Sequence, residues 1–239
     1  MTENIKSKIE ASGNTNYKGF LIDLIIYLSV MFLVRELYIP KVGFIANGLF
    51  WSLTTLIIAS WRMKVRGVSW KDLGLKKPDN LGKTIGISAI ILVSVLVSLI
   101  IFEIIKDQLP FSLTPDTSSE SAVSKFGDLK GNWLQFLLII PFVLLESMLE
   151  ELLDRGFLIY WFEKLFSKTS FATIIAVLLQ AMIFGFRHSY DLSERSITVG
   201  IIGLIMGIAY VKFGRNLWPL IIAHCLLNSM SMIGRVVDL

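Results

Sequence analysis

Residues 84–102 read TIGISAIILVSVLVSLIIF, nineteen consecutive residues without a charged side chain. Because about 20 helical residues cross the hydrocarbon core of a bilayer, this run predicts a transmembrane helix. Three further uncharged runs of 18 to 20 residues occupy 42–61, 169–186 and 216–234. The apolar stretches are continuous rather than alternating, which favours helical spans over a β-barrel.

The composition of the whole chain agrees with a membrane protein. Of its 239 residues, 54% are hydrophobic and 18% are charged, whereas soluble domains average about 45–50% apolar and about 25% charged. These values exclude a soluble enzyme and a disordered chain, and the single cysteine, Cys225, excludes a disulfide scaffold. The net charge of +4 indicates cytoplasmic Lys and Arg rather than nucleic-acid binding. We therefore expect an all-α polytopic bundle whose partner is the lipid bilayer.

The hydropathy pattern predicts seven transmembrane helices, with eight as the alternative. A continuous helix in the fourth stretch would be about 50 Å long, so we expect a break there. Pro141 could kink the helix, Gly156 could loosen it, or the stretch could form two shorter elements. In domain terms, 1–67 comprises a polar segment and the first two spans, and 68–239 forms the core. The expected spans lie near 19–38, 43–61, 83–105, 132–166, 169–188, 196–213 and 216–234.

Charge in the connecting segments predicts the orientation of the chain. Residues 62–83 hold seven Lys and Arg against two acids, which predicts a cytoplasmic loop. Residues 106–130 are rich in Ser, Thr, Pro and Asp and are expected on the opposite face. With seven spans the N-terminus lies inside, and Glu150 and His188 lie toward the outer half of the membrane. An eighth span would turn these two residues toward the cytosol.

Most of the charge inside apolar helices is gathered in one short stretch. Helical spacing of i,i+4 predicts an ion pair between Glu151 and Arg155. Glu146, Glu150 and Asp154 recur every four residues and form a separate acidic stripe. Because charges inside a bilayer are costly, they indicate either a functional site or a polar clamp between helices.

The only two histidines of the chain also lie in, or at the end of, apolar segments. A helical hairpin that turns near residue 168 would place Glu150 and His188 at similar depth. His224 and Asn228 are one helical turn apart on the same face. We therefore expect these four side chains to meet in one intramembrane pocket, although a packing histidine and an interhelical Asn hydrogen bond remain the alternatives.

This combination of side chains suits hydrolysis of an amide bond. A carboxylate beside an imidazole can hold and deprotonate water, and a second imidazole with a carboxamide can donate to an oxyanion. Glu150, His188 and His224 could also ligate a divalent metal such as zinc, with an open position for water. The helical H-E-x-x-H spacing is missing, so we favour a site without cofactor.

Three short motifs carry a resemblance to a known family. Residues 150–156, EELLDRG, resemble the E-E-x-x-x-R signature of the CPBP (CAAX protease and bacteriocin-processing, or Abi) intramembrane proteases. Residues 184–188 and 224–228 resemble the F-x-x-x-H and H-x-x-x-N motifs of that family, in the expected order. Residues 70–78, WKDLGLKKP, resemble a stretch that often precedes the core in bacterial members.

The resemblance implies the fold and the residue roles of type II CAAX prenyl endopeptidases. Members of this family have been described both as glutamate proteases and as metalloproteases, and we favour the first. The implied roles are Glu150 as the water-activating base, His188 as its partner, His224 and Asn228 as oxyanion donors, and Glu151 and Arg155 as supporting residues. Two positions depart from the family pattern: Asp154 replaces an aromatic residue, and Arg187 stands beside His188 where small or apolar residues are usual.

The leading hypothesis is therefore an intramembrane endopeptidase of a bacterial plasma membrane. Its substrate would be a peptide or membrane protein, cleaved in a CAAX-like reaction or in bacteriocin self-immunity. A catalytically silent scaffold or immunity partner of the same fold is the alternative, and a small transporter that uses the acidic stripe as a proton relay is the third hypothesis. The sequence leaves the oligomeric state open.

Overall fold

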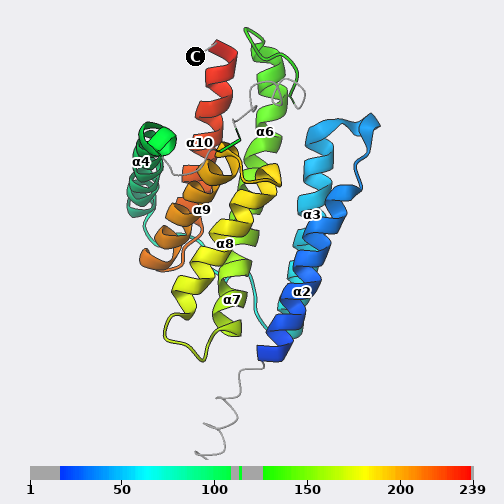
Figure 1. Cartoon of the computed structure of the whole chain (residues 1–239), viewed down its shortest axis with the longest axis vertical. Helices are drawn as coiled ribbons and strands as arrows, with labels where there is room; N and C mark the ends of the chain where they lie inside the picture. Colours follow the sequence, from blue (N-terminus) through cyan, green and yellow to red (C-terminus); the bar gives the residue numbers. More distant parts are fainter. Residues whose placement is uncertain (1–16, 109–112, 115–125, 238–239) are drawn as a thin grey trace, which may run out of the picture.

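The computed structural model describes residues 17–108, 113–114 and 126–237, and within them the chain is almost entirely helical (Figure 1). No strand forms in these residues apart from one isolated bridge between Thr114 and Ser193. Six of the described helices are long and apolar enough to cross a membrane. The all-α, multi-pass membrane fold expected from the sequence is confirmed.

The described helices follow the predicted spans closely. The N-terminal pair and the crossing helix are α2 (Tyr17–Leu33), α3 (Gly43–Arg66) and α4 (Leu81–Ile105), with short turns η1 (Val34–Glu36), η2 (Pro40–Val42) and η3 (Lys106–Gln108) beside them. The core continues with α6 (Trp133–Glu150), η4 (Glu151–Leu158), α7 (Ile159–Leu165), α8 (Ala172–Ser189), α9 (Glu194–Lys212) and α10 (Trp218–Val237).

The stretch from α6 to α7 differs from the expectation. We expected a break, by a kink at Pro141, a loosening at Gly156 or two shorter elements, but α6, η4 and α7 follow one another as an uninterrupted helical rod, with Gly156 inside η4. The irregularity takes the form of η4, a π-helix in which all eight residues are buried. Because η4 is buried, its charged side chains are enclosed by protein rather than by lipid.

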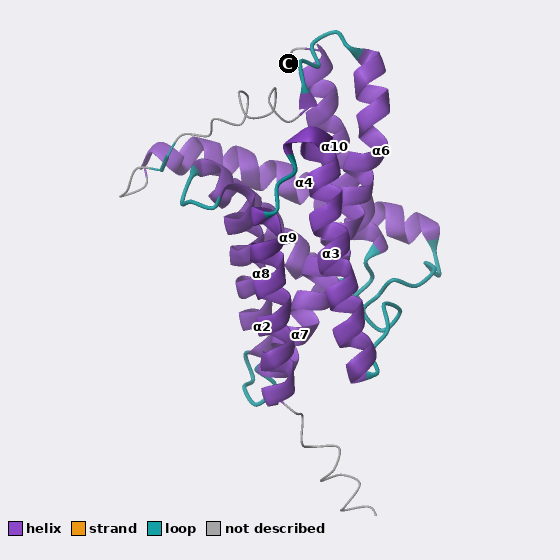
Figure 2. Cartoon of the chain, turned by 90° about the vertical axis from the view of Figure 1, so that its right-hand side faces the viewer, coloured by secondary structure: helices purple, strands orange, loops and turns teal. Residues whose placement is uncertain are grey.

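The other helices surround this rod. Figure 1 shows α2 and α3 side by side as one pair, α8 and α9 as a second pair, and α10 next to α6. Figure 2 shows α4 steeply inclined to the other long helices, across α9 and α10. The C-terminal end of α6 therefore meets α8 and α10 in the interior of the bundle.

Small residues allow α8 and α9 to approach closely. A side chain at Gly185 would collide with the backbone of Ser196 and Gly200 on α9. A side chain at Gly203 would likewise press on Phe184. Glycine at such positions lets helix backbones pack tightly in a membrane. This contact fixes the end of α8 that carries His188.

Residues 67–80 form a clasp beneath the turn between α9 and α10. The Leu73 side chain is fully buried, and its carbonyl accepts a hydrogen bond from Tyr210 at 2.8 Å. The Gly74 carbonyl accepts from the Leu217 backbone at 3.2 Å. Within the clasp, the hydroxyl and backbone N–H of Ser69 donate to Asp72 and hold the pKa of that carboxyl below its usual value. The clasp anchors the start of α10, the helix that carries His224.

Candidate active site

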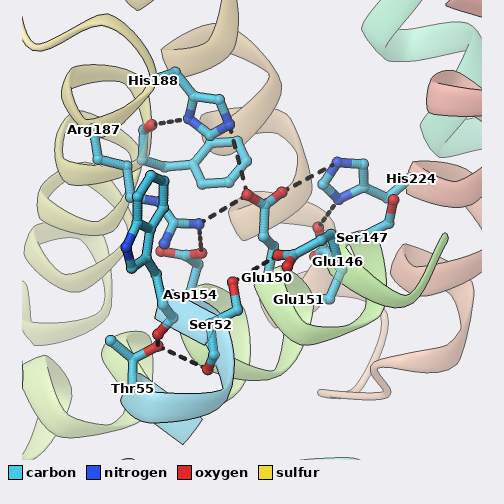
Figure 3. A network of polar contacts seen from close by, with 12 residues as sticks. Ser52, Thr55, Glu146, Ser147, Glu150, Glu151, Asp154, Arg187, His188 and His224 are labelled. Atoms are coloured by element: carbon cyan, nitrogen blue, oxygen red, sulfur yellow. Dashed lines mark hydrogen bonds and ion pairs between the residues drawn. The ribbon is translucent and has the colours of Figure 1, made fainter. Parts of the chain in front are cut away.

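Glu150, the last residue of α6, lies at the centre of a polar network (Figure 3). Its Oε1 lies 3.2 Å from a guanidinium nitrogen of Arg187 and 3.6 Å from Nε2 of His188. Its Oε2 lies 3.6 Å from Nε2 of His224. Side chains from α8 and α10 thus converge on one carboxylate, as the hairpin geometry predicts for His188.

The second nitrogen of each imidazole fixes its orientation. His188 Nδ1 lies 2.7 Å from the Phe184 carbonyl oxygen, which can only accept, so Nδ1 carries the proton. His224 Nδ1 lies 2.6 Å from Oε1 of Glu151 and donates to that carboxylate in the same way. Both rings therefore present Nε2 to Glu150, at distances longer than a hydrogen bond.

The predicted ion pair between Glu151 and Arg155 is present. Arg155 lies 3.0 Å from Oε1 of Glu151, and both side chains are fully buried. The Arg155 guanidinium also stacks over the Phe184 ring, 4.1 Å from its centroid. Because Glu151 Oε1 holds both Arg155 and His224, the pair connects η4 to α10 and restrains the imidazole.

Asn228 lines the same cavity as Glu150, but it contacts another residue. Its Nδ2 donates to the Ser147 hydroxyl at 2.8 Å, and that hydroxyl donates to the Val143 carbonyl at 2.9 Å. The carboxamide is therefore held against α6, one helical turn before the central carboxylate. Of the four predicted residues, Glu150, His188 and His224 meet directly and Asn228 stands in the cavity wall.

The rest of the acidic stripe is engaged by neighbouring helices. Glu146 accepts a hydrogen bond from Ser52 of α3 at 2.6 Å. Asp154 is fully buried and accepts from Arg187 at 2.8 Å. Arg187 therefore bridges Asp154 and Glu150, so the two positions that depart from the family pattern contact each other.

Sequence reasoning missed this bridge, although a signal for it was present. Asp154 and Arg187 lie 15 and 18 residues from residue 169, the midpoint of the hairpin, so they fall within one turn of each other in depth. Ser147 and Ser52 carried no comparable signal, because nothing in the sequence indicated which helices their hydroxyls face.

The network opens into a cavity of about 350 Å³. This is at the lower end of the range for sites that bind small molecules, about 300–1,000 Å³. Its walls combine the carboxylates of Glu146 and Glu150 with an apolar majority. The aromatic residues of the walls are Phe44, Trp51, Phe126, Phe142, Phe184 and Tyr190.

The geometry fits a metal ion poorly. Among residues 17–108, 113–114 and 126–237, no group of three His, Cys, Asp or Glu side chains is arranged to hold one. The Arg187 guanidinium lies 3.2 Å from Oε1 of Glu150, the carboxylate that would ligate a metal. A divalent cation there would face a like charge at close range.

Comparison with known proteins agrees with the geometry. Residues 132–230 match the model of a family described as type II CAAX prenyl endopeptidase Rce1-like. The match supports an intramembrane CAAX-type protease at the level of that family, and over these residues the resemblance stated from the sequence motifs is confirmed. No curated protein and no solved structure matches the chain.

The Rce1-like match covers most of the polar network. It begins one residue before α6 and ends within α10, so it contains Glu150, His188, His224 and Asn228. It lies inside the 68–239 core expected from the sequence. The helices α2, α3 and α4 precede it, yet α3 contributes Ser52 to the network and walls of the cavity.

Proposed function

We propose that this Rce1-like chain hydrolyses a peptide bond within the membrane, with water as the direct nucleophile. The observation that carries the proposal is the Glu150 carboxylate, held between two imidazole Nε2 atoms at 3.6 Å and facing a largely apolar cavity. Glu150 and His188 activate the water, and His224 and Asn228 stabilise the oxyanion.

The first step transfers one proton from water to Glu150. A water between the Glu150 carboxylate and His188 Nε2 would donate to both, because Nε2 is the unprotonated nitrogen of the neutral ring. As the proton moves to the carboxylate, the water oxygen bonds to the peptide carbonyl carbon. The carbonyl becomes a tetrahedral oxyanion.

The second step breaks the carbon–nitrogen bond. The oxyanion needs donors at its own position, and each such donor contributes about 2.7–4 kcal/mol in measured cases. His224 donates when Nε2 carries a proton, while Nδ1 stays bonded to Glu151. Asn228 supplies an N–H by turning away from Ser147. The leaving amine takes the proton from Glu150, and two peptides result.

We extend the proposal to the substrate class and the cellular setting. We propose a peptide or membrane-protein substrate, cleaved in a CAAX-like reaction or in bacteriocin self-immunity, at a bacterial plasma membrane. We propose no cofactor, because the guanidinium at Glu150 disfavours the zinc alternative. The competing function is a catalytically silent scaffold or immunity partner, which would keep its effect in cells after loss of Glu150.

The test is cleavage of a fluorescent prenylated CAAX peptide by the full chain in liposomes. We expect Glu150→Gln to lower kcat by about 10²–10⁴-fold, the usual contribution of a general base. Glu103→Gln changes an exposed carboxylate on α4 and should leave cleavage unchanged. Unimpaired cleavage by Glu150→Gln would contradict the mechanism, and loss of wild-type activity after treatment with a chelator would favour the metal alternative.

A further inference from the structure

Three arginines line the cavity of the candidate active site, and two of them are already bound to other groups. Arg35 donates to the Arg187 carbonyl at 2.7 Å and stacks on the Tyr190 ring at 4.1 Å. Arg187 itself contacts Glu150 and Asp154. These two cations therefore have partners within the protein.

Arg195, in the first turn of α9, is different. No hydrogen bond or ion pair joins its guanidinium to a residue that the structure describes, and its Nε, like that of Arg187, is buried without a partner. The neighbouring carboxylate, Glu194, instead pairs with Lys106 at 3.3 Å. A buried guanidinium nitrogen without a partner is unfavourable, because the lost hydration is not replaced. Arg195 thus has binding capacity that no other described residue uses.

The surroundings of Arg195 connect it to the reacting groups. Val199 and Ile202 follow it at i+4 and i+7 on the same face of α9, and both line the cavity. His188 also lines the cavity and is close enough to interact electrostatically with Arg195. A cation therefore stands at one end of an apolar wall, near the carboxylate that would activate water.

We propose that Arg195 binds the free α-carboxylate at the C-terminus of the substrate. The inference rests on the proposed protease function and makes Arg195 its specificity-determining residue. A guanidinium matches a carboxylate with two parallel hydrogen bonds, while an internal stretch of peptide offers no anion at this point. Val199 and Ile202 would contact the last side chains of the substrate. Cleavage would accordingly be confined to a site close to the end of a chain.

The test compares two forms of one peptide, a dansylated prenyl-cysteine followed by three apolar residues, ending in a free acid or in an amide. In phosphatidylcholine liposomes, we expect the wild-type chain to show a KM about 10–100-fold lower for the acid, the effect of a charge-assisted contact. Arg195→Gln should remove this difference with kcat changed less than about twofold. Arg195→Lys should restore part of it, and Arg235→Gln, in the last turn of α10, is the matched control.

Binding to a Glu150→Gln chain separates this inference from the protease proposal. If no form of the peptide is cleaved but the acid binds more tightly than the amide, and only with Arg195 present, the carboxylate site stands and the protease function fails. Equal binding of acid and amide would overturn the carboxylate site. So would loss of the preference when phosphatidylglycerol is added to the liposomes, because a lipid phosphate would then be the ligand.

Discussion

At the scale of single residues, the contacts of Arg187 distinguish this site from the pattern inferred from the family. A guanidinium nitrogen lies 3.2 Å from Glu150 and 2.8 Å from the fully buried Asp154. Arg187 therefore pairs with Asp154 as well as with Glu150, the residue proposed as the base. The two substitutions form a compensated pair, since either charge without the other would be buried without its partner.

Removing one member of this pair should destabilise the chain more than replacing both members with apolar residues. We expect Arg187→Leu to lower the free energy of unfolding by about 3–5 kcal/mol, because Asp154 is left buried without its cation. The double variant Arg187→Leu with Asp154→Leu should recover most of that loss. Thermal unfolding in detergent measures both effects. A double variant less stable than Arg187→Leu would contradict the proposed coupling.

At the scale of elements, the site depends on how closely α8 approaches α9 and the rod from α6 to α7. The hairpin of α7 and α8 turns between residues 166 and 171 and brings Glu150 level with His188, as the sequence predicts. The π-helix η4 was not predicted. All eight of its residues are buried, including Glu151, Asp154 and Arg155, so both faces of the charged segment have protein around them.

A side chain at Gly185 should displace α8 and with it His188. We expect Gly185→Ala to destabilise the protein by about 1–3 kcal/mol, the range for overpacked cores, and to lower cleavage activity. Gly86→Ala on α4 is the matched control, because an added methyl group there meets nothing within 4 Å. Unfolding and peptide cleavage are measured on both. Equal stability of the two variants would show that the helix contact is dispensable.

At the scale of the whole molecule, the arrangement of the helices fixes which loops share an end. The turn between α7 and α8 lies at the same end as the start of α2 and the end of α3, where Arg62 and Arg66 pair with Asp23 (Figure 1). Residues 126–132, which directly precede α6, lie at the opposite end. The basic end is expected in the cytosol.

Labelling of single cysteines tests this orientation. In a chain with Cys225→Ala, we expect Ser167→Cys to react with a membrane-impermeant maleimide only in inside-out vesicles. Asp128→Cys, in the exposed loop before α6, should react only in intact cells. Both positions are exposed, so accessibility reports the side of the membrane. The reverse pattern would place the basic end outside.

Sequence alone determined the class of the protein, because uncharged runs of about 20 residues have one stable structure in a bilayer. Sequence also identified the family motifs and the equal depth of Glu150 and His188, since helical spacing and one short turn are local properties. Only the tertiary structure decided that Arg187 bridges Glu150 and Asp154, that Asn228 rests on Ser147, and that Arg195 lines the cavity with an Nε that no described residue binds. These contacts join helices far apart in the chain, and local spacing does not fix the rotation of one helix against another.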